Sequence, residues 1–404
     1  MDRLDVRRHN LSLILRLLST QGSRSRAALS AATGLTRATV SSLAAELLDR
    51  GLIREVGMEV DQRIGRPATL LQVAGAHIVT MGVELGVGYT AVLATDLAGT
   101  VVYERRRPLA SMSVGPSDVV AVLVSEIRRA LKAMRVNDMV TVGITVAVAG
   151  VVDRRTGTVV FAPNLGWRDV PLLDRLRAAL DLSIPLALEN EANLGAVAEF
   201  RNGASAGTPY LVYLLVENGV GAGIIADGRL LRGAFGSAGE FGHTTVRPGG
   251  ELCACGSRGC WETTIGLRAL LGATVPDLAV GLMGDRRLSP EAKIAAVIDR
   301  AEAGDPTVLR GLEDLGEWLG IGLANVVDSL NPEVIVLAGI VSSIAAWVLE
   351  PAARAMRAHT LRMPTECRIE TTTLGFSAAA LGGTLAAAER LFNDPLIDIR
   401  GASF

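Results

Sequence analysis

Apolar residues recur at helical spacing in three short stretches at the start of the chain. The first stretch predicts a helix that ends at Gly22, and its apolar stripe consists of Leu11, Ile14, Leu15, Leu17 and Leu18. A second helix is predicted over residues 25–33, ending at Gly34, and a third over 36–50, where Thr36 is suited to cap the N-terminus. Two short helices joined by a tight glycine turn have the layout of a helix-turn-helix motif.

Two alternating segments, 52–56 and 69–73, follow the third helix and predict the strands of a wing. The tip of the wing carries Arg63 and Arg66, and an extended arginine-rich tip can enter a narrow minor groove. On the third helix the exposed positions hold small hydroxyls and one arginine, suited to phosphates and base edges: Thr36, Arg37, Thr39, Ser41 and Ser42. We therefore expect a winged helix-turn-helix DNA-binding domain over 1–75, with a protein-binding three-helix module as the alternative.

Beyond residue 76 the pattern changes to buried strands separated by longer helices. Strands are predicted over 77–85, 91–97, 101–107, 140–148, 158–161 and 185–189, and helices over 117–134, 171–179 and 192–201. The order then begins again, with strands over 209–216, 221–225, 229–231 and 334–337 and helices over 289–303, 306–330 and 375–391. Two similar series predict a pair of α/β lobes with a cleft between them. We assign the first lobe to 76–195, completed by the C-terminal helix over 375–392, and the second lobe to 196–374.

The net charge of −2 conceals an uneven distribution of charged residues. Residues 1–72 contain 11 arginines against 7 acidic residues, a balance of +4, which leaves −6 for the rest of the chain. A basic head on an acidic body favours an anionic partner, double-stranded operator DNA, for the head alone. Because a DNA contact this small is weak, a specific site requires at least a dimer, and we expect a homodimer or a homotetramer.

Two features of the sequence bear on the compartment. The charged N-terminal residues lack the apolar segment of a signal peptide. The longest uncharged apolar run, residues 139–152, has 14 residues and is too short to span a bilayer as a helix. Three clustered cysteines and a separate Cys367 fit a reducing compartment better than a disulfide framework. We therefore expect a cytoplasmic protein with no membrane partner.

A cluster of thiols indicates a metal site in the second half of the chain. Three of the four cysteines fall within eight residues, and a histidine lies ten residues upstream: Cys253, Cys255, Cys260 and His243. Three thiolates and one imidazole form a complete tetrahedral ligand set, which indicates a structural zinc ion and leaves no open position for catalysis. The alternative is that the cysteines are merely small buried apolar residues. A zinc ion here would fix the flanking carboxylates Glu240 and Glu262.

The sequence around this cluster resembles the ROK family of repressors, open reading frames and kinases. The resemblance rests mainly on Gly-Glu-Phe-Gly-His at 239–243 and on the Cys-x-Cys-Gly-x-x-Gly-Cys-x-Glu run at 253–262. Further support comes from Ala-Pro-Asn-Leu-Gly-Trp at 162–167, Glu-Asn-Glu-Ala-Asn at 189–193 and Asn-Pro-Glu-Val-Ile-Val-Leu at 331–337. The resemblance covers nearly the whole chain. It implies an α/β protein with the two-lobed actin-like ATPase fold of the ROK sugar kinases and an N-terminal winged helix-turn-helix.

The resemblance also implies which side chains hold a sugar in the cleft. By similarity they are Asn164, Asn190, Glu191, Glu240, His243 and Glu262. His243 would give one ring nitrogen to zinc and the other to the sugar, so that the metal orients a ligand-binding imidazole. Carboxylates and amides can accept from and donate to adjacent hydroxyls in fixed directions, which suits carbohydrate recognition.

Departures from the kinase pattern lie mainly on the nucleotide side. Glu84 stands where ROK kinases have an Asp before Gly-Gly-Thr, and the chain continues with Gly-Val-Gly at 86–88. Glu217 stands at the start of the segment that is Gly-Thr-Gly in the kinases, where a carboxylate would repel a triphosphate. The kinase base, an Asp, is here Glu191, and a displacement of about 1 Å can cost about a hundredfold in rate. We therefore expect a degenerate kinase domain with no catalytic residues.

The longer side chain of Glu191 also suggests the effector. It would fill part of the space for the exocyclic 6-hydroxyl of a hexose, which a pentose lacks, so we expect xylose or another free aldose. The leading hypothesis is a sugar-responsive transcriptional repressor that binds operator DNA with its head and sugar in its cleft. The alternatives are an active ATP-dependent sugar kinase with a DNA-binding head, and a protein-binding adaptor with an inert cleft.

Overall fold

The computed structural model describes residues 3–59, 68–75, 77–109, 115–285, 288–361 and 366–397. The N-terminal head consists of the helices α1 (Arg3–Gln21), α2 (Arg26–Thr33) and α3 (Arg37–Asp49) and a sheet with the order β1-β3-β2. The strands of this antiparallel sheet are β1 (Arg24–Ser25), β2 (Ile53–Glu59) and β3 (Ala68–Val73). The three predicted helices and both wing strands are confirmed. The sequence analysis missed β1, because two residues carry no period.

The turn between α2 and α3 begins and ends at the capping residues that the sequence predicts, Gly34 and Thr36. Gly34 closes α2 with a φ of 72°, a left-handed conformation that glycine adopts without strain. Thr36 caps α3, because its hydroxyl accepts a hydrogen bond from the Thr39 N–H at 3.2 Å. These two ends fix the angle between the helices and leave the first turn of α3 at the surface.

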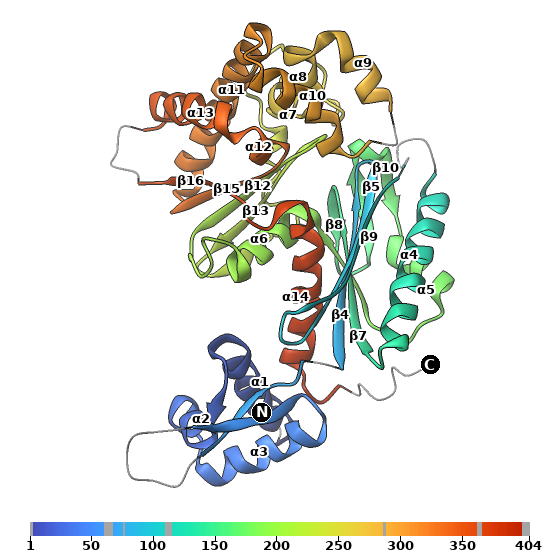
Figure 1. Ribbon diagram of the computed structural model, residues 1–404, viewed down its shortest axis with the longest axis vertical. Helices are drawn as coiled ribbons and strands as arrows, with labels where there is room; N and C mark the ends of the chain where they lie inside the picture. Colours follow the sequence, from blue (N-terminus) through green and yellow to red (C-terminus); the bar gives the residue numbers. More distant parts are fainter. Residues whose placement is uncertain are drawn as a thin grey trace.

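The first lobe is built on a five-stranded sheet with the order β11-β7-β4-β5-β6, in which β4, β7 and β11 run parallel. The strands are β4 (Ile78–Gly86), β5 (Tyr89–Asp96), β6 (Val101–Pro108), β7 (Val140–Val148) and β11 (Leu186–Asn190). The helices α4 (Pro116–Val136) and α5 (Leu172–Leu180) share an apolar core with one face of this sheet (Figure 1). A small antiparallel sheet adjoins it, with strands β8 (Val151–Asp153), β9 (Thr158–Ala162) and β10 (Trp167–Val170).

The second lobe repeats this order of strands. Its sheet runs β16-β15-β12-β13-β14, so that β12, β13 and β15 take the places of β4, β5 and β7. The strands are β12 (Leu211–Val216), β13 (Val220–Ala226), β14 (Arg229–Leu231), β15 (Val334–Gly339) and β16 (Arg368–Thr371). The helices of this lobe are α7 (Glu262–Ile265), α8 (Leu267–Thr274), α9 (Pro276–Gly284), α10 (Pro290–Glu302), α11 (Pro306–Leu330), α12 (Ile340–Ser343) and α13 (Ala345–His359). Among the described residues, no helix is both long and apolar enough to cross a membrane.

The repeated series of strands and helices in the sequence is confirmed by this topology. The bounds of β7 and α11 agree with the prediction at both ends. Several short elements were not predicted, namely β8, β10, β16, α7, α8, α9 and α12, because few residues carry too little periodicity. The longer α13 was also missed, and it contains Pro351, which interrupts a helical pattern.

Two helices cross between the lobes (Figure 1). The helix α6 (Glu191–Asn202) leads out of the first lobe and packs on β12 and β13, whereas α14 (Ala378–Asn393) returns and packs on β4 and β7. The two helices also pack against each other, and a Cβ on Gly382 would lie 1.9 Å from the carbonyl oxygen of Leu194. The backbones of α6 and α14 are therefore in direct contact, with no side chains between them at this point. Because no side chains can rearrange there, a movement of one helix is passed on to the other.

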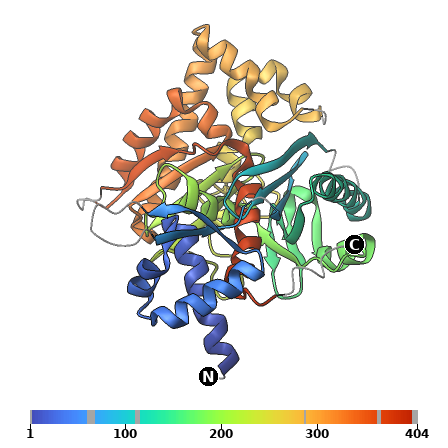
Figure 2. The same cartoon turned by 60° about the horizontal axis from the view of Figure 1, so that its bottom comes forward.

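The head packs on the far end of α14, as Figure 2 shows for the blue head and the red helix. Phe392 joins the apolar core of the head. Arg16 of α1 pairs with Glu389 at 2.5 Å, and Arg8 pairs with Asp394 at 3.0 Å. The head and α14 therefore form one packed unit, so that the helix connects the first-lobe sheet with the head.

Candidate functional site

The loop after β14 brings the four predicted zinc ligands together. The ligand atoms of His243, Cys253, Cys255 and Cys260 all lie within 4.8 Å of one another. Nδ1 of His243 is 3.6 Å from Sγ of Cys253, and Sγ of Cys255 is 3.7 Å from Sγ of Cys260. Because ligands about 2.3 Å from a tetrahedral ion are roughly 3.7 Å apart, the donor set fits zinc in both chemistry and spacing.

Local sequence explains why this loop can close. Gly259 has a φ of 73°, and a Cβ there would lie 1.7 Å from the carbonyl oxygen of Arg247. Only glycine fits this close approach. Trp261, which is fully buried, donates its indole N–H to the carbonyl oxygen of Trp318 at 2.9 Å and ties the loop to α11. This anchor fixes the position of the next residue, Glu262.

Two of the candidate sugar-binding side chains meet from opposite lobes. Asn164 lies in the short 3-10 turn η2 (Pro163–Leu165) of the first lobe, and Glu262 is the first residue of α7 in the second. A Cβ built on Gly219 would lie 2.5 Å from Nδ2 of Asn164 and 2.7 Å from Oε2 of Glu262. Glu262 accepts a hydrogen bond from the N–H of Val220 at 3.1 Å, which leaves further lone pairs for a ligand.

Glu240 and His243 share one turn, with Glu240 directly before the 3-10 helix η3 (Phe241–His243). Nε2 of His243 lies 3.9 Å from Oε2 of Glu240, while Nδ1 faces the cysteines. Burial raises the pKa of Glu240, the nearby His243 lowers it, and Glu262 raises it again, so the two carboxylates border the same region. The imidazole therefore connects the metal ligands with the carboxylates of the cleft.

Asn190 and Glu191 stand at the junction of β11 and α6. Oδ1 of Asn190 accepts from the Asn193 N–H at 3.0 Å and caps α6, and its Nδ2 donates to the carbonyl oxygen of Gly150 at 2.9 Å. Glu191 has a buried Oε2 that finds no partner among the described residues. Burial, followed by the charges of nearby carboxylates, raises the pKa of Glu191 well above its ordinary value. A neutral Glu191 can donate a hydrogen bond to a ligand oxygen.

Protein side chains fill the space around the glycine turn at 86–88, between the two lobes. The phenol oxygen of Tyr89 lies 2.5 Å from Oε1 of Glu84 and 3.2 Å from Oε1 of Glu217. One hydroxyl proton cannot serve both contacts at once, so both are satisfied as hydrogen bonds only when one of the two carboxyls is protonated. Burial, with Glu84 as the next cause, raises the pKa of Glu217 to about 7. The ring of Tyr89 also covers the glycine turn, since a Cβ on Gly86 would lie 2.3 Å from it.

Arg106 closes the same side from β6. Its guanidinium lies 3.9 Å from the ring centroid of Tyr89 and 5.0 Å from that of Phe376. It also pairs with Glu291 of α10, in the other lobe. The sequence analysis singled out the two carboxylates here but missed Tyr89 and Arg106. The sequence did contain a signal for Tyr89, because it directly follows Gly-Val-Gly at 86–88. An aromatic ring at this position can cover a glycine turn that would otherwise be open to a phosphate.

Two family profiles match the chain. That of the ROK family matches residues 80–390, and that of the IclR helix-turn-helix domain matches residues 11–57. The chain belongs to the ROK family. Together with the observed topology, this confirms the predicted fold, a helix-turn-helix head on a two-lobed actin-like ROK domain.

The relatives of this ROK protein include regulators and kinases. It is 33% identical to the xylose repressor of Bacillus spizizenii over 340 residues, 83% of each chain. It is 34% identical to the glucokinase of Streptomyces coelicolor over 283 residues, 68% of this chain and 85% of that enzyme. Among solved structures, a ROK family transcriptional regulator that is a homologue of the E. coli MLC protein superposes with a TM-score of 0.79. That match has 25% identity and covers 96% of this chain and 97% of the other.

The candidate DNA-binding residues of the ROK head lie on the first turns of α3. The exposed side chains there are Thr36, Arg37, Ser41 and Ser42. Thr39 is half-buried, and its hydroxyl lies 2.9 Å from that of Thr36. Among the described residues, no carboxylate pairs with Arg37, which leaves its guanidinium available to an anion. Arg63 and Arg66, predicted at the wing tip, lie outside the described residues.

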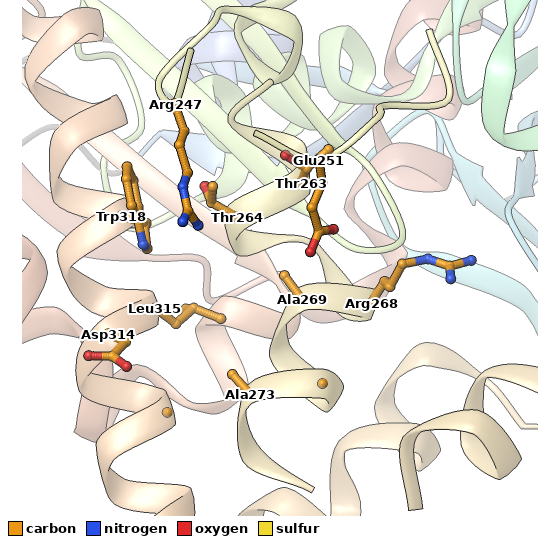
Figure 3. A pocket seen from close by; sticks show the side chains of 12 residues that line it. Arg247, Glu251, Thr263, Thr264, Arg268, Ala269, Ala273, Asp314, Leu315 and Trp318 are labelled. Carbon is orange, nitrogen blue, oxygen red and sulfur yellow. The ribbon is translucent and has the colours of Figure 1, made fainter. Parts of the chain in front are cut away.

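A surface groove of about 610 Å³ lies on the second ROK lobe, between the loop that carries the clustered cysteines, α8 and α11 (Figure 3). Small and apolar side chains form part of its lining, including Ala269, Ala273 and Leu315. Arg247 extends over Trp318 at one side, with 5.8 Å between the guanidinium and the ring centroid. None of the candidate sugar-binding residues lines this groove. The polar set of the interlobe cleft is therefore the better candidate for a sugar site.

Proposed function

We propose that this ROK protein is a sugar-responsive transcriptional repressor, whose head binds operator DNA and whose cleft binds a free sugar. The observation that carries the proposal is the contrast between the two halves of the cleft. On one half Asn164 and Glu262 converge from opposite lobes, with spare hydrogen-bonding capacity. On the other half Tyr89 and Arg106 occupy the space over the glycine turn. A cleft of this kind is suited to bind a sugar without phosphorylating it.

For the effector we propose xylose or another free aldose. The sugar hydroxyls would be held by Asn164, Asn190, Glu191, Glu240, His243 and Glu262. Similarity to proteins named xylose repressors, over most of the chain, supports a pentose. The buried Oε2 of Glu191, which has no partner among the described residues, supports a polar ligand at this position.

We propose that the metal is zinc and that its role is structural. It would be held by His243, Cys253, Cys255 and Cys260, whose four donors complete a tetrahedral shell. A bound zinc ion would supply rigidity rather than catalysis. The residues that benefit are Glu240 and Glu262, which flank the ligands in the chain.

We propose that kinase activity is lost. A nucleotide at the glycine turn would have to displace the ring of Tyr89 and break the pair between Arg106 and Glu291. Its phosphates would also meet Glu84 and Glu217, which are buried carboxyls and repel further negative charge when ionised. The glucokinase relatives support the alternative of an active sugar kinase, so phosphorylation of xylose and glucose by ATP should be assayed directly.

We propose three functional units: the head over 1–75, a first lobe over 76–195 with the returning helix, and a second lobe over 196–374. Asn190 and Glu191 lie at the start of α6, α6 packs on α14, and α14 anchors the head at Phe392. A sugar that binds one arrangement of the lobes better than another would favour that arrangement. The change would move α6 and, through its packing, α14 and the head. In a homodimer or homotetramer, the shift would alter the spacing of two heads and hence their fit to half-sites about one DNA turn apart.

The DNA contacts would come from the first turns of α3 and from the wing. The proposed residues are Thr36, Arg37, Thr39, Ser41, Ser42, Arg63 and Arg66. Fluorescence anisotropy with the DNA that flanks the gene of this protein, repeated with xylose, glucose, N-acetylglucosamine and ATP, tests the whole proposal. We expect specific DNA binding that changes most with xylose and does not change with ATP. Absence of DNA binding under every condition, or tighter binding of glucose than of xylose, would contradict it.

A further inference from the structure

Glu189, the residue before Asn190, is a buried carboxylate whose two oxygens both contact neighbouring groups. Only 3% of the surface of Glu189 is exposed to solvent. Oε1 accepts from the N–H of Asn190 and from Nδ2 of Asn193, both at 3.1 Å. Oε2 accepts from Nε of Arg232 at 2.8 Å and forms an ion pair with Arg154, whose Nε lies 3.0 Å away. Three hydrogen bonds and one ion pair thus surround the buried carboxylate, so we expect Glu189 to act through the groups it holds rather than by contact with a ligand.

The two arginines that reach Glu189 come from different lobes. Arg154 lies between β8 and β9 in the first lobe, to which Glu189 also belongs. Arg232 follows β14, the edge strand of the second-lobe sheet, so its bond to Glu189 crosses from lobe to lobe. The carbonyl oxygen of Arg232 also accepts from the N–H of Ala238 at 3.1 Å. This second bond ties Arg232 to the segment that leads into Glu240.

We propose that Glu189 is an interlobe positioning residue of the sugar pocket, an inference that rests on the proposed sugar-binding function. On one side its carboxylate holds the start of α6, which carries Asn190 and Glu191. On the other side it holds Arg232 and, through that residue, the segment before Glu240. A charge-assisted bond to a buried carboxylate is stronger than one at the surface. The bond therefore favours the arrangement in which the sugar ligands of the two lobes face one another.

Two arginine-to-methionine variants distinguish two roles of the arginines. One role is to join the lobes, and the other is only to provide a positive charge for the Glu189 carboxylate. Arg232→Met removes the second-lobe bond and leaves Glu189 paired with Arg154. Arg154→Met is the control, because it removes the other arginine that pairs with Glu189 and leaves the interlobe hydrogen bond in place. Each variant keeps a long apolar side chain and leaves one guanidinium on Glu189, so the buried carboxylate is never without a charged partner.

We expect Arg232→Met to weaken xylose binding about tenfold in titration calorimetry, since loss of a hydrogen bond to a charged group has an effect of about this size. The sugar-induced change in operator affinity should fall as well, while operator affinity without sugar stays close to that of the wild type. Arg154→Met should have a much smaller effect on xylose affinity. Arg232→Lys, which keeps a charge, should recover part of the loss. Equal effects of the two methionine variants, or no effect of Arg232→Met, would overturn the proposal.

The wild-type protein distinguishes this inference from the proposed function. If the wild type binds neither xylose nor any other aldose, the proposed function is wrong and the role of Glu189 in sugar binding is wrong with it. If the wild type responds to sugar and Arg232→Met responds equally, only the positioning role is wrong. Circular dichroism melts check that both variants fold. If Arg232→Met does not fold, Arg232→Gln and Arg232→Lys carry the same comparison against Arg154→Met.

Discussion

The phenol oxygen of Tyr89, on the first lobe, lies 3.2 Å from Oε1 of Glu217, which directly follows a strand of the second lobe. A second bond spans the lobes nearby, because Nδ2 of Asn218 donates to the carbonyl oxygen of Val87 at 3.0 Å. The chain itself thus makes the interlobe contacts on the side where a kinase of this fold would hold ATP. Ligand-dependent contacts are left to the sugar side of the cleft.

The contact between Tyr89 and Glu217 should make stability depend on pH. Burial raises the pKa of Glu217 to about 7, above its ordinary value of 4.5, although Arg106 opposes the shift. The folded protein therefore holds more protons than the unfolded chain between these values, and the free energy of unfolding falls as the pH rises through this window. Glu84 and Glu191 shift in the same direction.

The variant Glu217→Gln tests this pH dependence, because an amide keeps the shape of the side chain without its titration. We expect the wild type to lose about 2 kcal/mol relative to the variant between about pH 5 and about pH 8. Urea denaturation at the two pH values measures the difference. Parallel pH dependences of the two proteins would show that Glu217 does not take up a proton on folding.

Metal analysis of the purified protein should find zinc, and Cys255→Ser should lower both the zinc content and the Tm. The physical reason is that the loop carrying His243 and Glu262 depends on four donors for its shape. Sugar binding should be lost with the metal. Cys367→Ser is the control, since its thiol lies outside the cluster, and it should retain zinc. A fully stable, zinc-loaded Cys255→Ser protein would contradict the prediction.

Glu262→Gln should weaken sugar binding at least about tenfold, because an amide nitrogen replaces one carboxylate oxygen that accepts from a hydroxyl. The substitution keeps an acceptor for the N–H of Val220, so the fold should be preserved. Glu251→Gln, at an exposed position in the same loop, is the matched control. Calorimetry with xylose compares the three proteins. An unchanged affinity in Glu262→Gln would remove this residue from the sugar site.

Arg37→Ala should weaken operator binding, because the exposed guanidinium at the start of α3 has no carboxylate partner among the described residues. If Arg37 meets a phosphate, the slope of log affinity against log salt should fall by about one. Arg310→Ala, on the exposed surface of the second lobe, should leave DNA binding unchanged. Anisotropy titrations over a series of salt concentrations provide the measurement. Identical curves for Arg37→Ala and the wild type would exclude a DNA contact.

Arg16→Met should reduce the effect of sugar on DNA binding while leaving sugar affinity close to that of the wild type. Arg16 ties α1 to Glu389 and Asn393 at the end of α14, so its loss loosens the head from the helix that reaches the cleft. Arg177→Met is the control and should keep the full sugar response, because Arg177 pairs with Asp174 on the surface of α5, outside the route through α6 and α14. If both variants keep the full sugar response of the wild type, the α14 route is wrong.

Much of the fold could be predicted because it depends on residues close together in the chain. The helix α11 and the strand β7 have bounds that follow from apolar periodicity alone. The zinc cluster was equally visible, since its ligands lie between His243 and Cys260 and Gly259 lets the loop close on itself. Which candidate residues face one another in the cleft could not be read from such patterns.

The sequence by itself determined the elements, the repeated lobes and the metal-ligand spacing, because these follow from local geometry and from the chemistry of single residue types. Only the tertiary structure decided that Tyr89 meets Glu217, that Arg106 pairs with Glu291, and that Arg232 reaches across to a buried carboxylate on the first lobe. Each of these contacts joins residues far apart in the chain. They form because α6, which packs on the second-lobe sheet, and α14, which packs on the first-lobe sheet, also pack against each other and so hold the two lobes together, which no local period encodes.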